Sequence, residues 1–484
     1  MSLLKNRHSF SFRLKQTSGG GMNLPCKTFA AVISSTVIFT FVFAQAPDTI
    51  WTKRYGTDEH DEGYDIQPTA DGGYIIVGKT GFHGAPSGPY LYLIKIDGEK
   101  GDSLWAKIYG TDEKAAIGYA VQATSDSGYI VAGYKEFSAS GNRDVYLLKT
   151  DSLGDTLWTK TYGSIYEDVC RSVIQTFDKG YLIAGYTYFY TGSHLYLIKT
   201  DSLGDTVWTK AYGELDQFAS AVSVEQTQDG GYVIAGTTGP IEYAYRGWLL
   251  RTNAEGDTLW TKTYGDENWD TFFHAMQITS DSGYILVGEA HYAYYDRRTY
   301  LVRTDKYGNV HWSRKYLGSF DPLVDILGQS VQQTTDGGFA VVGMRFYPYN
   351  NFDIYVIRTD SLGTTLWTQN YGDFDDQEIG YSIQVTSEGN YIIAGSKDSL
   401  QTYDYDVSVM KTEPDVGIEE NEPSIVISRR ISATIISGPL RLPEDKKCRI
   451  FDVTGRVVEP TTVTRGIYFV EIDNEIVQKV IKIR

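Results

Sequence analysis

The chain has 484 residues, of which 42% are hydrophobic and 14% aromatic, enough for a large core, and its 38 tyrosines against 5 methionines favour β structure. Its 44 basic and 61 acidic residues give a net charge of −17, which disfavours nucleic acid and anionic membranes as partners. With three cysteines, the chain shows no sign of a disulfide framework.

The first 46 residues are predicted to be an export signal. An uncharged apolar run at 28–44 follows a lysine and ends among alanines, and Met22 lies at the usual distance before it. Met22 is therefore expected to be the initiator. The run is also close to the shortest length that spans a membrane, so a retained anchor is the alternative. This region holds five basic and no acidic residues, so the mature chain has 39 basic and 61 acidic residues and a net charge of −22.

A tryptophan recurs seven times along the chain. The stretch 151–163, DSLGDTLWTKTYG, returns almost letter for letter at 201–213, and the successive tryptophan spacings are 54, 53, 50, 52, 52 and 55 residues. Self-similarity at a period near 50 residues indicates a solenoid or a propeller. The tryptophans are Trp51, Trp105, Trp158, Trp208, Trp260, Trp312 and Trp367.

Each repeat contains four strand-like runs joined by turns, two of them short and rich in Asp and Gly, as β-hairpins require. Runs such as 74–77 are apolar at consecutive positions, so both faces of each sheet are expected to be covered. Four-stranded sheets stacked face to face around an axis provide that cover. The sequence therefore predicts an all-β, seven-bladed β-propeller with four-stranded blades over residues 47–412.

The two ends of the repeat region are complementary. It opens with a lone tryptophan strand at 48–56 and closes at 381–412 with three strands and no tryptophan strand. The first strand is therefore expected to complete the last blade and hide edges that would invite aggregation. The inner strands end in threonine, with Gln or Glu two residues earlier in six repeats. Ladder and turn hydrogen bonds are favoured over a polar channel lining as the explanation.

The region after the repeats changes character. Residues 413–424 are acidic and contain prolines, which is typical of a linker. Between residues 429 and 484 there are 11 basic and 7 acidic residues, distributed over short β-like runs. Residues 425–484 are therefore predicted to form a small separate all-β domain.

Two resemblances add to these predictions. The hairpin residues Asp151, Gly154 and Trp158 resemble the tryptophan-docking motif of pyrroloquinoline-quinone-type propellers, which have one more residue between Asp and Gly; this likeness concerns the fold alone. The C-terminal residues resemble the sorting domain of type IX secretion substrates, a small β-sandwich that directs an exported protein across the outer membrane. This resemblance implies a secreted or cell-surface protein that interacts with the type IX machinery. The matching positions are Asp452, Gly455, Arg456, Gly466, Tyr468 and Lys482.

One face of the propeller is predicted to carry a ligand site. Connections alternate between faces, so the acidic links between blades share a face with the tyrosine-rich loops between second and third strands. Aromatic rings stack on sugar rings, and carboxylates accept hydrogen bonds from sugar hydroxyls, so this face suits a glycan, with calcium or a basic peptide as alternatives. The candidate residues are Tyr188, Tyr190, Tyr243, Tyr245, Tyr292, Tyr294, Tyr295, Tyr347, Asp168, Asp270, Asp325 and Asp376.

No motif points to a particular reaction. The seven histidines show no paired ligand spacing, and there is no nucleophile elbow, phosphate-binding loop or dinucleotide fingerprint. The sequence predicts an interaction module, monomeric and not membrane-spanning when mature, that binds a glycan, polymer or protein without a cofactor. A glycan hydrolase or lyase using carboxylates of the same face is the first alternative, and a purely structural surface protein is the second.

Overall fold

The computed structural model describes residues 45–415 except for short loop segments. The segments outside the description are 86–87, 111–114, 137–141, 190, 241–244, 268, 292–296, 318–324, 348–350, 373–375 and 399–403. Beyond residue 415 it describes 433–436, 448–452, 458, 466–472 and 475–482. All regular elements in these ranges are strands, and none of the described residues forms a helix long and apolar enough to cross a membrane.

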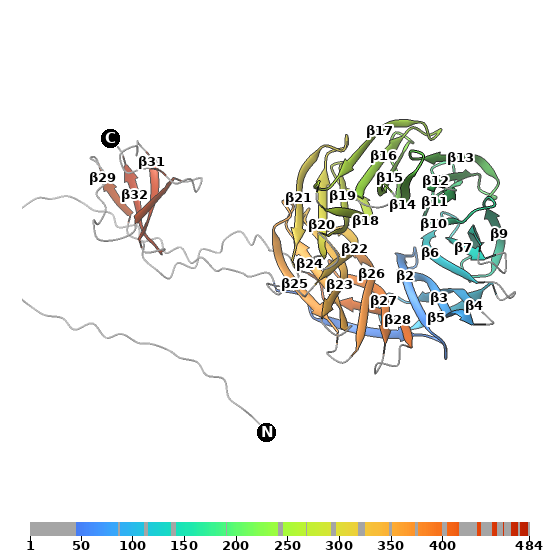
Figure 1. Ribbon diagram of the computed structural model, residues 1–484. Coiled ribbons are helices and arrows are strands. Elements are labelled where there is room, and N and C mark those ends of the chain that lie inside the picture. Colours follow the sequence, from blue (N-terminus) through green and yellow to red (C-terminus); the bar gives the residue numbers. More distant parts are fainter. Residues whose placement is uncertain are drawn as a thin grey trace, which may run out of the picture. The chain divides into compact units, whose positions relative to one another are not determined.

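Seven antiparallel sheets of four strands each are arranged as a ring (Figure 1), and cavities lined by the inner strands form a channel along its axis. Blade 1 consists of β2 (Asp61–Pro68), β3 (Tyr74–Ala85), β4 (Gly88–Ile96) and β5 (Ser103–Tyr109). Blade 2 consists of β6 (Ala116–Ala123), β7 (Tyr129–Glu136), β8 (Arg143–Thr150) and β9 (Thr156–Tyr162). Blade 3 consists of β10 (Asp168–Gln175), β11 (Tyr181–Phe189), β12 (Gly192–Thr200) and β13 (Thr206–Tyr212). Blade 4 consists of β14 (Gln217–Gln226), β15 (Tyr232–Pro240), β16 (Arg246–Thr252) and β17 (Thr258–Tyr264).

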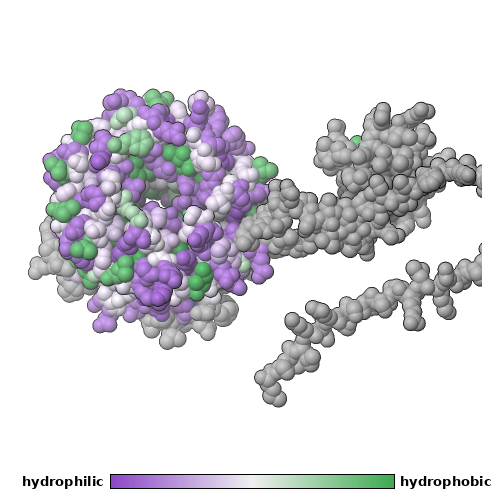
Figure 2. Space-filling view, turned by 180° about the vertical axis from the view of Figure 1, so that it is seen from behind, coloured by the Kyte–Doolittle hydropathy of each residue, from purple (hydrophilic) through white to green (hydrophobic). Residues whose placement is uncertain are grey.

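The remaining blades follow the same pattern. Blade 5 consists of β18 (Asp270–Ile278), β19 (Tyr284–His291), β20 (Arg297–Thr304) and β21 (Val310–Tyr316). Blade 6 consists of β22 (Ile326–Gln333), β23 (Phe339–Tyr347), β24 (Asn351–Thr359) and β25 (Thr365–Tyr371). Blade 7 consists of β26 (Gln377–Val385), β27 (Tyr391–Asp398), β28 (Tyr405–Thr412) and β1 (Thr49–Tyr55). Figure 2 shows one face of the ring, mostly hydrophilic, with a hollow at its centre.

Blade 7 confirms the predicted closure of the ring. β1, the first strand of the chain, pairs with β28 along its length, so that Trp51 lies opposite Lys411 and Thr52 opposite Met410. The seven-bladed, four-stranded architecture is thereby confirmed. Contacts with the propeller continue beyond residue 412. The amide of Glu413 donates a hydrogen bond to the carbonyl of Asp48 (2.7 Å), and the carboxylate of Asp415 forms an ion pair with Arg358 (2.7 Å). These residues belong to the segment that composition assigned to a linker.

Among the described residues, the hydrophobic core consists mainly of seven large clusters, each between two neighbouring blades. Between blades 1 and 2, for example, the fully buried Ile75 and Leu91 pack against Val131 and Leu148. Burying each such side chain stabilises the fold by roughly 1.5–3 kcal/mol. Each sheet is thus covered on both faces, as the consecutive apolar residues in its strands predicted.

The recurring hairpin letters form a joint between consecutive blades. Trp158 of β9, in blade 2, packs on Gly204 in the turn before β13 of blade 3, where an added Cβ would lie 2.9 Å from the indole ring. Lys160 pairs with Asp205 (2.8 Å), and the hydroxyl of Tyr162 donates to the carbonyl of Gly204 (2.6 Å). The Trp-Thr-Lys-x-Tyr segment of one blade therefore holds the Asp-x-x-Gly-Asp turn of the next. The other glycines packed on a tryptophan in this way are Gly101, Gly154, Gly256, Gly308 and Gly363.

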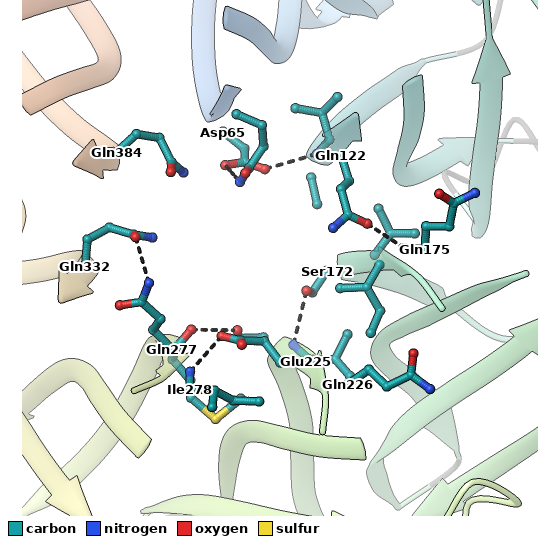
Figure 3. Close-up of a pocket in the computed structure, with 18 of the residues that line it drawn as sticks. Asp65, Gln122, Ser172, Gln175, Glu225, Gln226, Gln277, Ile278, Gln332 and Gln384 are labelled. Carbon is teal, nitrogen blue, oxygen red and sulfur yellow. Dashed lines mark hydrogen bonds between the residues drawn. The ribbon is translucent and has the colours of Figure 1, made fainter. Parts of the chain in front are cut away.

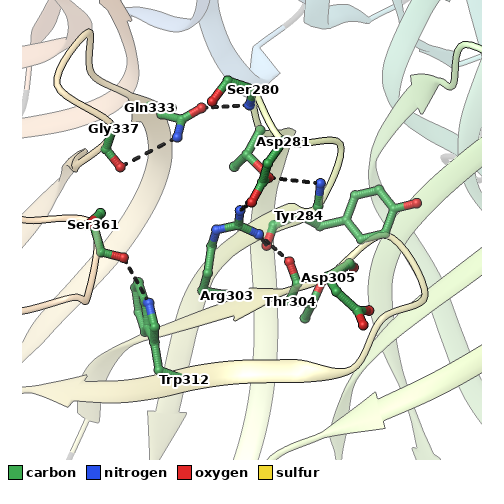
Figure 4. Close-up of polar contacts among 12 residues, drawn as sticks. Ser280, Asp281, Tyr284, Arg303, Thr304, Asp305, Trp312, Gln333, Gly337 and Ser361 are labelled. Atoms are coloured by element: carbon green, nitrogen blue, oxygen red, sulfur yellow. Dashed lines mark hydrogen bonds and ion pairs between the residues drawn. The ribbon is translucent and has the colours of Figure 1, made fainter.

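A second recurring pair, between a cation of the third strand and an aspartate of the turn between the first two strands, fixes six of the seven blades internally. The Asp281 carboxylate at the turn between the first two strands of blade 5 accepts hydrogen bonds from Thr279 (2.7 Å) and Arg303 (2.5 Å) (Figure 4). Turn hydrogen bonds therefore account for the threonines at the ends of the inner strands, as predicted. The cations of this pair have side chains only 2–8% exposed, and they are Lys95, Lys149, Lys199, Arg251, Arg303 and Arg358.

The C-terminal strands form a separate sheet. It contains β29 (Ala433–Ile436), β30 (Cys448–Asp452), β31 (Gly466–Ile472) and β32 (Glu475–Lys482) in the order β29-β32-β31-β30, with only β29 and β32 parallel. Backbone contacts group residues 420–484 apart from the propeller. The described C-terminal strands make one sheet, and the prediction of a sandwich concerns residues that lie largely outside the described ones.

Candidate functional site

The inner strand of each blade contains a β-bulge at the same place. In β10, Cys170 lies opposite Gly185 of β11 and Ser172 lies opposite Ala184. Arg171 is therefore an extra residue that has no opposite residue on β11. Gly185 is required there because a Cβ would lie 1.9 Å from the carbonyl oxygen of Val169. A bulge redirects a side chain. The seven bulge residues, called the bulge ring below, are Tyr64, Tyr119, Arg171, Val222, His274, Gln329 and Tyr381.

All seven bulge residues line one cavity of about 670 Å³ at the end of the channel where the inner strands begin. The other wall residues include Glu62, Tyr186, Tyr188, Phe272 and Glu289. The repeat's recurring residues are used in the joints and turns, whereas the bulge ring differs from blade to blade. Seven similar blades therefore build an asymmetric site.

Three tyrosines of the bulge ring form a continuous aromatic wall. The ring centroid of Tyr64 lies 5.4 Å from that of Tyr119 and 5.4 Å from that of Tyr381. Tyr119 also packs on the buried Tyr134, at 5.9 Å. Burial raises the pKa of Tyr64 and Tyr381 well above its usual value, so both hydroxyls stay protonated and are able to donate hydrogen bonds.

The carboxylate beside this wall is already neutralised by its neighbours. Glu62 accepts hydrogen bonds from His60 (2.7 Å) and forms an ion pair with Lys79 (2.8 Å). Burial alone would raise the pKa of Glu62, but these bonds outweigh it and lower the pKa to about 2. Glu62 is therefore ionised at any physiological pH, and its charge is balanced within the wall.

His274 and Glu289 face each other in blade 5. The Nε2 atom of His274 lies 4.0 Å from Oε1 of Glu289, and Arg297 lies 3.9 Å from the other carboxylate oxygen. Neither Nε2 of His274 nor Oε2 of Glu289 has a hydrogen-bond partner among the described residues, although both atoms are buried. Burial lowers the pKa of His274, so its imidazole is neutral at neutral pH. The cavity wall thus contains two polar atoms whose hydrogen-bonding capacity is not used by the described residues.

Aromatic residues also line the side of the cavity formed by blades 4 and 5. Phe218 packs on Tyr245 at 5.5 Å, and Tyr245 on Phe272 at 5.0 Å. Phe272 is stacked on His291 at 5.4 Å, with the two ring planes 8° apart. The cavity therefore has aromatic surface on two sides, with polar groups between them.

The opposite end of the channel carries a ring of amides (Figure 3). The glutamines two residues before the turn threonines do line this part of the channel, in a cavity of about 440 Å³. They also join the blades, since Gln277 accepts a hydrogen bond from the amide of Gln333 (2.6 Å). Glu225 likewise accepts a hydrogen bond from the amide of Ile278 (3.1 Å). These side chains are bonded within the ring of blades, so this end is the weaker candidate for a ligand site.

Neither a protein-family model nor a curated protein matches this chain. Among solved structures, a polysaccharide lyase that is an ulvan lyase has a TM-score of 0.50 and 9% identity, covering 75% of this chain and 96% of its own. A protein of unknown function from Dyadobacter fermentans has a TM-score of 0.48 and 10% identity, and the match covers 76% of this chain and 98% of that protein. The β-propeller domain of the trilobed protease from Pyrococcus furiosus has a TM-score of 0.43 and 10% identity, and the match covers 76% of this chain and 99% of that domain. The chain has a β-propeller fold. At such identities the likeness extends no further than that.

The carboxylates predicted as ligands are already bonded to other groups of the propeller. Asp168 is buried and accepts a hydrogen bond from the amide of Ser164 (2.6 Å). Asp270 accepts one from the amide of Tyr245 (2.8 Å), and Asp325 one from the amide of Arg297 (3.0 Å). Asp376 pairs with Lys397 (3.0 Å). None of these four carboxylates lines the cavity of the bulge ring.

The predicted tyrosines are distributed differently. Tyr188 lines the cavity and packs on Tyr186 at 5.4 Å. Tyr245 lies behind the cavity wall in the stack with Phe272, and the hydroxyl of Tyr347 accepts a hydrogen bond from Asn370 (2.6 Å). The remaining candidates lie outside the described residues, and they are Tyr190, Tyr243, Tyr292, Tyr294 and Tyr295.

Sequence reasoning overlooked the bulge ring, although a signal was present. Each bulge residue lies five positions before the threonine that follows its inner strand, as Arg171 does before Thr176. Aligning the repeats on that threonine gives a column that reads Tyr, Tyr, Arg, Val, His, Gln, Tyr.

For calcium, the described residues include no group of three or more His, Cys, Asp or Glu placed to hold a metal ion.

Proposed function

We propose that the protein binds a glycan in the cavity of the bulge ring. The observation that carries this proposal is the convergence of side chains from seven blades on a single cavity whose walls are aromatic on two sides. Its volume of about 670 Å³ lies within the range of about 300–1,000 Å³ that is usual for small-ligand sites. A chain of a few sugar rings fits such a space.

The chemistry of the walls matches a sugar. The apolar faces of pyranose rings stack on aromatic rings, and Tyr64, Tyr119 and Tyr381 present such surfaces side by side. The amide of Gln329 and the hydroxyl of Ser220, which also line the cavity, donate and accept hydrogen bonds as sugar hydroxyls do. This combination of stacking surface and neutral polar groups favours a glycan over a basic peptide.

The proposed location is outside the cell or on its surface, after export by the type IX pathway. It is supported by the apolar run at 28–44 and by the resemblance of the C-terminal residues to a sorting domain. Asp452 pairs with Tyr468 and Gly466 with Lys482 in the C-terminal sheet, while Gly455 and Arg456 lie outside the described residues. Deleting residues 425–484 is expected to leave the protein in the periplasm, as cell fractionation would show.

The binding proposal is tested by screening the purified chain against an array of neutral and acidic oligosaccharides and measuring Kd for hits by calorimetry. Tyr64→Ala and Tyr381→Ala are each expected to weaken binding at least about tenfold, because a stacking surface worth about 1.4 kcal/mol is lost. Tyr307→Ala is the control: Tyr307 is an exposed tyrosine in the turn of blade 5 at the opposite end of the channel. Affinity unchanged by both wall variants would contradict the proposed site.

A second candidate function is a hydrolase or lyase reaction on a polysaccharide at the same cavity. It is favoured by His274 and Glu289, whose buried Nε2 and Oε2 atoms lack partners among the described residues. A neutral imidazole is able to accept a proton from substrate. The test is product release from polysaccharides, followed by reducing ends for a hydrolase and by the ultraviolet absorbance of unsaturated sugars for a lyase. If His274→Ala keeps binding and abolishes turnover, the enzyme is favoured; binding with no turnover in the unaltered chain favours the binding module.

A further inference from the structure

Arg171 is the charged member of the bulge ring that lacks a partner. It is exposed in the cavity, and no described residue forms an ion pair or accepts a hydrogen bond from its guanidinium. The six cations of the third strands, by contrast, are each paired with an aspartate of the neighbouring turn. The guanidinium of Arg171 is therefore a positive charge in the cavity whose N–H donors are open to a ligand.

The geometry holds this guanidinium ready for an anion. Its central carbon lies 4.0 Å from the ring centroid of Tyr119, so the tyrosine covers one face of the planar group. Tyr119 is itself held between Tyr64 and Tyr134, so this support is fixed. The N–H groups at the edge of the guanidinium remain open, and they form the fork that binds two oxygens of a carboxylate or sulfate.

The other charges around the cavity leave this positive charge uncompensated. Glu62 forms an ion pair with Lys79 and a hydrogen bond with His60, and Glu289 lies 3.9 Å from Arg297. Burial lowers the pKa of His274. The charge of Glu289 raises this pKa, whereas the charges of Arg171 and Arg297 lower it further. The field of Arg171 therefore extends across the cavity. The site is locally receptive to an anion within an acidic protein.

We propose that Arg171 binds the acidic group of a sugar, a carboxylate or a sulfate ester, while the sugar ring stacks on the adjacent tyrosines. The inference rests on the proposed glycan-binding function and specifies its ligand as an acidic polysaccharide. The long-range repulsion from a net charge of −17 means that affinity must come from this local contact. The neutral bulge residues, such as Gln329, then serve the hydroxyl groups.

The test compares three oligosaccharides by calorimetry on the purified chain: an oligogalacturonide, its neutral methyl ester, and a sulfated oligogalactan. The unaltered protein is expected to bind one of the acidic ligands at least tenfold more tightly than the ester, and the tighter of the two identifies carboxylate or sulfate as the group. Arg171→Gln is expected to lose at least tenfold for that ligand and to leave the ester unaffected. Arg171→Lys should retain part of the affinity, since it keeps the charge but not the fork. Arg314→Gln, at an exposed arginine of β21, is the control and should change nothing.

Failure of the inference and failure of the proposed function look different in this experiment. Equal binding of the ester and the acidic ligands, or no effect of Arg171→Gln, overturns the role of Arg171 while glycan binding stands. Absence of binding to all three saccharides and to the wider array overturns both. Binding of a glutamate-rich peptide with dependence on Arg171, and of no saccharide, also overturns both, because the ligand is then an acidic protein.

Discussion

At the scale of the residue, Glu225 stands out in the amide end of the channel. It occupies the position that glutamine holds in five other blades, and it accepts the same hydrogen bond from the next inner strand. Burial raises its pKa from 4.5 to about 7. The folded protein therefore keeps this proton up to about pH 7, whereas the unfolded chain loses it near pH 4.5. The stability contributed by Glu225 is present below pH 4.5 and is lost as the pH rises to about 7.

Glu225→Gln is expected to remove this loss, because an amide oxygen accepts the same hydrogen bond without a charge. At pH 8 the free energy of unfolding should rise by up to about 3 kcal/mol, and at pH 4 it should change little. Chemical denaturation at both pH values measures the difference. Gln277→Glu is the reverse substitution at the equivalent place, and it should destabilise the protein at pH 8. Identical pH dependence in all three proteins would contradict this account.

At the scale of the element, six of the joints between blades depend on a glycine in the turn that the tryptophan contacts. Gly154 has a φ of +78°, and a Cβ there would lie 2.8 Å from the ring of Trp105. Its carbonyl also accepts a hydrogen bond from Tyr109 (2.6 Å). Gly154→Ala is therefore expected to cost about 1–2 kcal/mol for the left-handed backbone and a further 1–3 kcal/mol for displacing the tryptophan.

Gly337 provides the matched control for this prediction. Its φ is +80°, but nothing lies within 4 Å of an added Cβ. Gly337→Ala should therefore show the backbone cost alone, about 1–2 kcal/mol. Thermal or urea unfolding of the two variants separates the two contributions. Equal destabilisation would mean that the tryptophan joint tolerates displacement and is not what holds neighbouring blades together.

The elements differ in how far the sequence reveals them. Strands and turns were predictable because their patterns are local: apolar runs, Asp-Gly turns and the recurring tryptophan all lie within a few residues. A bulge is defined by pairing with another strand, so the redirection of Arg171 into the channel is not visible in its own neighbourhood. The carboxylates failed to appear in the cavity for a similar reason, because Asp270 bonds to an amide 25 residues away.

At the scale of the molecule, the ring is closed by the pairing of its first and last strands. Six residue pairs join β1 to β28, and Trp51 of β1 also packs on Gly101 of blade 1. On the other side, the hydroxyl of Tyr371 in blade 6 donates to the carbonyl of Pro47 (2.8 Å). The chain's beginning therefore holds blade 7 to both of its neighbours. Closure also fixes the bulge ring, since Tyr381 of blade 7 meets Tyr64 of blade 1 across this seam.

Removing residues 1–56 should open the ring at this seam. The loss of six paired positions, at about 1 kcal/mol each, and of the Trp51 joint is expected to lower Tm by more than about 10 °C. The free edge of β28 should also promote self-association, which light scattering would detect. Removal of residues 1–44 is the control, because it keeps β1 and all its contacts. If the shorter chain melted at the same temperature as the control and kept its affinity for glycan, the pairing of β1 with β28 would not be what positions Tyr381 against Tyr64.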